Sequence, residues 1–150
     1  MPEHNPFPLF EVFNEIGIIE QLSRARLEAR LPDGMIAPHF SVLNHLIRVG
    51  DGPTPMQLAR AFQVPKTSMT HTLKVLEKRA AIETRSNPND GRSKQVWLTA
   101  KGRDIRDQAI QALAQDFSEL AQGIDIEVLK AIQPALTSLR KHLDTNRGQS

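Results

Sequence analysis

The chain of 150 residues contains no cysteine, which excludes a disulfide framework, a zinc finger with cysteine ligands and a redox switch based on a thiol. It also lacks any apolar run close to the ~20 residues that a membrane-spanning helix needs. Residues 1–6 have neither the basic nor the apolar segment of a signal peptide. We therefore expect a cytoplasmic protein with no contact to a membrane.

The net charge is only +2, but it is unevenly distributed along the chain. Residues 54–106 carry eleven basic and four acidic side chains, whereas the remainder carries eight basic and thirteen acidic ones. A basic segment between acidic flanks indicates that one lobe meets a polyanion. A solvated basic face is the alternative, and charge alone does not separate the two interpretations.

Apolar residues at three- and four-residue spacing predict a mainly helical protein. The predicted helices cover residues 9–30, 38–49, 55–62, 65–79, about 100–122, and the segment from Asp125 through Leu143. Thr54 and Gln57 form a capping box before the third helix, and Thr99 and Asp125 are candidate caps of the last two. Pro134 lies inside the last helix, where we expect a kink or a break.

The period changes from helical to alternating in two short segments, residues 82–85 and 95–98. Ile82 and Thr84 then fall on the same side of a hairpin as Val96 and Leu98. Turn-forming residues fill 87–92, so the hairpin is predicted to have a long tip.

A helix, a tight turn, a second helix and a hairpin follow one another in the order of a winged helix-turn-helix. The second helix keeps short hydroxyl groups and a few cations outside its apolar stripe, a face that suits the major groove of DNA. An arginine at the hairpin tip can reach the minor groove, whose negative potential attracts a guanidinium. A merely solvated amphipathic helix is the alternative for 65–79, and the basic hairpin that follows argues against it.

Two motifs in this segment resemble those of MarR-type transcriptional regulators. Residues 89–102, NDGRSKQVWLTAKG, match the family's wing pattern of Asp-x-Arg, a strand and Leu-Thr-x-x-Gly. Residues 67–73, TSMTHTL, with 76–79, LEKR, match the recognition helix. The resemblance covers roughly residues 36–143. Two positions depart from the pattern: Ala80 replaces a usual glycine, so a left-handed helix end there would be strained or the turn would differ, and His71 replaces a common arginine.

The resemblance implies a mainly α fold with a small β-hairpin wing. A winged helix-turn-helix domain would span residues 37–103, and residues 1–36 with 104–150 would form a helical dimerisation lobe. Within the first, Arg92 would enter the minor groove, and Asp90 would orient it or hold the wing turn by accepting backbone N–H groups. The candidate DNA-binding residues are Lys66, Thr67, Ser68, Thr70, His71, Lys74, Arg85, Asp90, Arg92 and Lys94.

The first and last helices are too apolar for a monomer, because exposed stripes of this size normally mark an interface. We expect a homodimer that pairs with a pseudo-palindromic operator in double-stranded DNA. The candidate dimer residues are Phe10, Phe13, Leu129, Ile132, Leu136 and Leu139. The resemblance further implies that a small aromatic or phenolic effector releases the DNA. Its candidate contacts are Phe13, Ile16, His39, Phe40, Leu43 and Arg48.

The leading hypothesis is a repressor relieved by such a ligand, with no cofactor and no metal. A winged-helix module for protein–protein contact is the alternative, and it predicts weak DNA binding that does not depend on Arg92. An enzyme would need a nucleophile with a base, or a metal set. The histidines, at positions 4, 39, 45, 71 and 142, are too scattered to supply either.

Overall fold

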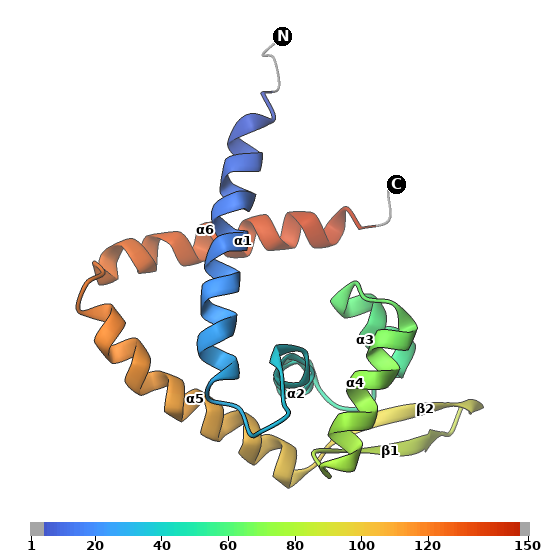
Figure 1. Ribbon diagram of the computed structural model, residues 1–150. Coiled ribbons are helices and arrows are strands. Elements are labelled where there is room, and N and C mark those ends of the chain that lie inside the picture. The colour runs from blue at the N-terminus through green and yellow to red at the C-terminus, as the bar shows by residue number, and fades with distance from the viewer. Residues whose placement is uncertain (1–4, 148–150) are drawn as a thin grey trace. The chain divides into compact units, whose positions relative to one another are not determined.

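The computed structural model describes residues 5–147, and the chain divides into two compact units, Met1–Leu113 and Ala114–Ser150. The elements are α1 (Phe7–Glu28), α2 (Ala37–Val49), α3 (Pro55–Phe62), α4 (Lys66–Lys78), β1 (Ile82–Asn87), β2 (Asp90–Leu98), α5 (Ala100–Ala121) and α6 (Ile126–Thr145) (Figure 1). Six helices and one antiparallel hairpin confirm the predicted fold class. The division into a DNA-binding domain and a dimerisation lobe stays a prediction.

Side-chain caps begin three of the helices where the sequence predicts them. The backbone N–H of Gln57 donates to Thr54 Oγ1 at 3.2 Å, and the Thr54 N–H donates to Gln57 Oε1 at 2.9 Å. The Gly102 N–H donates to Thr99 Oγ1 at 3.0 Å, and Asp125 caps α6. These caps satisfy backbone donors that have no partner within the helix.

The helix α6 is continuous through Pro134, so the chain has no break at that residue. Proline removes one helical hydrogen bond, because it has no N–H to donate to the carbonyl four residues earlier. The helical hydrogen bonds on both sides of it are sufficient to carry the helix from Ile126 to Thr145.

The core of the first unit lies between α2, α3, α4 and the hairpin. Its largest fully buried side chains are Val42, Leu43, Leu58, Leu76 and Val96. On α2, the buried residues are His39, Val42, Leu43 and Leu46, whereas Phe40 and Ile47 are half-buried.

The hairpin pairs Ile82 with Leu98 and Thr84 with Val96, which confirms that these four residues lie on one side of it. The end of the tip is tighter than predicted, because β1 continues to Asn87 and β2 begins at Asp90, with two residues between them. The register breaks between Ser86 and Asn87, so residues 91–93 have no partner on β1. Side chains explain the difference. Asn87 Oδ1 accepts from the Asn89 N–H, and Asp90 Oδ1 accepts from the Arg92 N–H, each at 3.0 Å. Residues that usually open a loop here tighten it.

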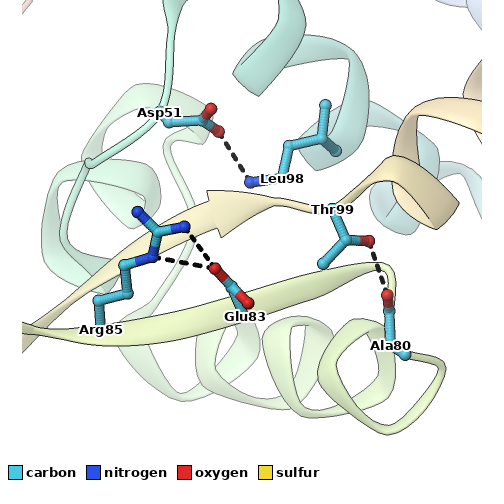
Figure 2. A network of polar contacts seen from close by, with 6 residues as sticks. All are labelled: Asp51, Ala80, Glu83, Arg85, Leu98 and Thr99. Atoms are coloured by element: carbon cyan, nitrogen blue, oxygen red, sulfur yellow. Dashed lines mark hydrogen bonds and ion pairs between the residues drawn. The ribbon is translucent and has the colours of Figure 1, made fainter.

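The outer edge of β2 is fixed to the segment that follows α2. The Val96 N–H donates to the Pro53 carbonyl at 2.8 Å, and the Gly52 N–H donates to the Val96 carbonyl at 2.9 Å. Asp51 Oδ1 accepts from the Leu98 N–H at 2.7 Å (Figure 2). The base of the wing is thereby held to the helical core, while its tip projects from it.

The helix α4 ends in the left-handed turn that the Ala80 departure put in question. Ala80 has a φ of 57°. Its N–H donates to the Glu77 carbonyl, and the Ala81 N–H donates to the Leu76 carbonyl, both at 2.9 Å. This pair of bonds is a Schellman motif, whose left-handed residue is usually glycine. The turn is therefore retained, and the alanine methyl strains it.

Substituting Ala80→Gly is expected to stabilise the protein by about 0.5–1 kcal/mol. Glycine removes the left-handed strain, and part of that gain is lost because it adds entropy to the unfolded chain. The measurement is the free energy of unfolding from chemical denaturation. Ala114→Gly, at an exposed position inside α5, is the matched control and should lose about 1 kcal/mol. The same loss in both variants would contradict a strained turn at Ala80.

Candidate nucleic-acid interface

One face of α4 is exposed, and it holds every candidate residue predicted for that helix. Met69, Leu73 and Leu76 bury the opposite face. The exposed side chains are Lys66, Thr67, Ser68, Thr70, His71 and Lys74. Four- and three-residue spacing keeps them on one side of the helix, where hydroxyl, imidazole and ammonium groups alternate. This composition can offer hydrogen bonds to base edges and charge to phosphates.

Two threonine hydroxyls on α4 already donate within the helix. Thr70 Oγ1 donates to the Lys66 carbonyl at 2.9 Å, and Thr72 Oγ1 donates to the Ser68 carbonyl at 3.1 Å. With its hydrogen engaged, the Thr70 hydroxyl can still accept a hydrogen bond, and its methyl group can contact the methyl of a thymine.

The wing tip is held by side chains that bond to its own backbone. The Asp90 carboxylate accepts from the Arg92 N–H at 3.0 Å, which supports its predicted role of holding the turn. Asn87 Nδ2 donates across the tip to Ser93 Oγ at 3.0 Å. The Arg92 side chain is exposed. Sequence reasoning missed Asn87 and Ser93, although Asn87 lies two residues before a backbone N–H that it can cap.

Arg85 differs from the other basic candidates because its guanidinium is already paired. Its Nε and Nη2 donate to Glu83 Oε1 at 2.9 and 2.5 Å (Figure 2). Its Cζ lies 4.0 Å from the centroid of the Trp97 ring. Lys94, opposite Ser86 on β2, is exposed.

The candidate effector contacts do not share one environment. His39 and Leu43 lie in the core, with 5% and 0% of their surface exposed. Phe40 is half-buried, and Arg48, Phe13 and Ile16 are exposed. Of the six, Leu43 has a packing role in this chain, because no part of its side chain reaches the surface.

His39 supports the start of α2 from within the core. Its Nδ1 accepts from the Ile36 N–H at 2.9 Å. Burial lowers the pKa of His39, and the positive charges of Arg79 and His71 lower that pKa further. The imidazole is therefore neutral at pH 7 and keeps the lone pair that accepts this bond. The Arg79 guanidinium also donates to the Asp33 carbonyl, which ties the end of α4 to the loop before α2.

The candidate dimer residues lie on two helices whose side chains stay largely exposed within one chain. Neither α1 nor α6 has a buried residue. Phe10 is 67% exposed, and Phe13, Leu129, Ile132 and Leu136 are between 37% and 43% exposed. Leu139 is half-buried. Apolar side chains extend around the whole circumference of α1 from Phe7 to Leu22, a distribution that is typical of a helix surrounded by protein.

Comparison with known proteins shows which family has this arrangement of helices and hairpin. Residues 33–93 match the sequence profile of the MarR family. The crystal structure of wild-type MarR from E. coli is similar to the chain at 28% identity and a TM-score of 0.72, over 84% of this chain and 94% of that one. Residues 33–93 of the chain thus belong to the MarR family.

Two further structures resemble this MarR family chain. A mutant MarR from E. coli, in complex with operator DNA, is 26% identical with a TM-score of 0.70, over 89% of this chain and 96% of that one. A structure described only as MarR has a TM-score of 0.83 and covers 100% of this chain and 99% of that one, but at 20% identity it supports the fold alone. This chain thus has the fold of DNA-binding transcription regulators, which are generally not enzymes.

Within residues 5–147, no helix is long and apolar enough to cross a membrane. The same residues contain no group of three or more histidine, aspartate or glutamate side chains placed to hold a metal ion.

Proposed function

We propose that this MarR family chain is a homodimeric transcription regulator that binds a pseudo-palindromic operator sequence-specifically. The observation that carries the proposal is the exposed polar face of α4 together with the hairpin that α4 contacts, whose tip presents the exposed Arg92. A helix with this face fits the major groove, and an arginine beside it fits the neighbouring minor groove. The operator complex of the E. coli relative supports the same use of the fold.

The contacts divide by chemistry. Ser68, Thr70 and His71 carry short polar groups suited to base edges, and Thr67 lies beside them. The lysines, Lys66, Lys74 and Lys94, are suited to phosphates, which set the position of the protein on the duplex. Arg92 would sense the width and potential of the minor groove, while Asp90 keeps the turn that carries it.

Dimerisation would cover the apolar helices. A C2 pair uses the same patch on both subunits, so the exposed residues of α1 and α6 would be buried by their counterparts. Two recognition helices related by that axis would contact half-sites about 34 Å apart, one turn of DNA. Their spacing would make the operator symmetric.

Regulation would follow the family's pattern of a repressor released in the cytoplasm by a small aromatic or phenolic acid. Phe13, Ile16 and Phe40 offer apolar surface, and the exposed Arg48 offers a guanidinium for a carboxylate. His39 and Leu43 would then pack beneath this surface and would not contact the ligand.

Selection of bound duplexes from a random pool at physiological salt tests the proposal. We expect enrichment of a two-fold symmetric motif whose half-sites lie about one helical turn apart. A single unpaired half-site would contradict the dimeric binding mode. No enrichment of any sequence by a folded dimer would contradict DNA recognition and favour a protein–protein module.

A further inference from the structure

Arg85 is held on the outer side of the hairpin by two neighbours. Glu83 lies two residues before it on β1, so both side chains project from the same side of the strand. Both donors of the bond, Nε and Nη2, point to the single oxygen Glu83 Oε1. Trp97, the cross-strand partner of Glu83, supports the plane of the guanidinium from below at 4.0 Å.

The remaining basic candidates have no such compensation. Within the described part of the chain, the side chains of Lys66, Lys74, Arg92 and Lys94 have no ion-pair partner. Among the described residues, the ion pair on the α4 face and the wing is the one between Arg85 and Glu83. The structure therefore assigns to one cation of the proposed interface a carboxylate of its own.

Glu83 occupies the Nε–Nη2 edge of the guanidinium, one of the two forked edges that a phosphate can use, and it places a negative charge beside the other. Arginine binds carboxylates and phosphates alike through parallel N–H donors, in the same fork geometry. A phosphate oxygen must therefore displace Glu83 from this edge, or approach with a negative charge beside it. The pair is half-exposed, at 52% for each side chain, and a pair of this kind is weak enough to be displaced.

We propose that Glu83 limits the affinity of the protein for DNA by competing with a backbone phosphate for Arg85. The inference rests on the proposed function, which it deepens by naming a residue that restrains binding. Trp97 stacks on the face of the guanidinium and leaves its edges open. It can therefore hold Arg85 in place whether the edge is bound to Glu83 or to a phosphate. Glu83 thus acts through Arg85 and does not itself touch the DNA.

The test is the substitution Glu83→Gln, which keeps the shape and an acceptor oxygen but removes the competing charge. We expect tighter binding to specific and random duplexes alike. One additional phosphate contact steepens the slope of log K against log salt by about 0.9. The gain in affinity over the wild-type protein should therefore shrink about threefold between 50 and 200 mM salt.

Glu77→Gln is the matched control. It makes the same change of charge on α4, but the Glu77 carboxylate accepts from the Thr84 hydroxyl at 3.3 Å and pairs with no cation among residues 5–147. Its salt slope should equal that of the wild-type protein. In an Arg85→Gln background, Glu83→Gln should leave the slope unchanged, because no guanidinium remains to be released.

The outcomes separate this proposal from the proposed function. If the wild-type protein binds its selected duplex but Glu83→Gln binds with unchanged or weaker affinity and the same slope, competition by Glu83 is wrong and the regulator remains. If Glu77→Gln steepens the slope equally, net charge explains the effect and the competition is again wrong. If the wild-type protein itself binds no duplex, the proposed function fails first.

Discussion

Gly102→Ala is expected to destabilise the protein by about 3 kcal/mol, at the upper end of the cost of overpacking. A Cβ at residue 102 would lie 2.0 Å from the Ala81 carbonyl oxygen and 2.9 Å from Leu98 Cδ1. The first of these neighbours is backbone, so a rotamer change cannot relieve the contact. The better helix propensity of alanine, worth about 1 kcal/mol, does not offset a clash of this size.

The close approach at Gly102 joins the start of α5 to the end of α4. Thr99 Oγ1 donates to the Ala80 carbonyl at 2.6 Å, and the Thr99 N–H donates to the Ala81 carbonyl at 3.2 Å (Figure 2). Moving α5 away to admit a methyl group would lengthen both bonds. The recognition helix would then lose the support that fixes its C-terminal end.

Thermal unfolding measures this effect, and a loss of 3 kcal/mol corresponds to about 6–12 °C in a protein of this size. Gly91→Ala is the control, because a Cβ there meets nothing within 4 Å. Its midpoint should be unchanged or slightly raised, since alanine lowers the entropy of the unfolded chain. Equal midpoints for the two variants would show that α5 moves aside at no cost.

Much of the fold could be predicted because its signals are local. The period of apolar residues, the capping box at Thr54 and the change of period at Ile82 each depend on neighbours a few residues away. The same holds for the exposed face of α4, which follows from the positions of Met69, Leu73 and Leu76. The exposure of α1 and α6 in a single chain was also predictable, because the first and last helices are too apolar for a monomer.

The remaining features depend on contacts between distant segments. The role of Gly102 requires the position of Ala81, twenty-one residues earlier in the chain. The stacking of Arg85 requires Trp97 on the opposite strand, whereas its carboxylate partner Glu83 lies only two residues earlier. His39 lies in the core, where its Nδ1 accepts from the Ile36 N–H, whereas the family resemblance placed it among the candidate ligand contacts.

Arg92→Ala is expected to weaken binding to the selected operator by about 1–3 kcal/mol, a loss of roughly fivefold to 150-fold. The guanidinium is exposed at the wing tip, and its fit depends on minor-groove width, which varies with sequence. Random duplex should lose less, because a generic phosphate contact replaces only part of that interaction. Folding should be unaffected, since Asp90 bonds to the backbone of residue 92 rather than to its side chain.

Lys94→Ala, two residues along the same strand, separates charge from specificity. It removes one exposed positive charge, as Arg92→Ala does, but we expect it to weaken specific and random duplexes by similar factors and to reduce the salt slope by about one. Titration of both variants on both duplexes at several salt concentrations measures the difference. If Arg92→Ala lowers affinity for the two duplexes equally, Arg92 contributes only charge, and specificity must then come from the side chains of α4 alone.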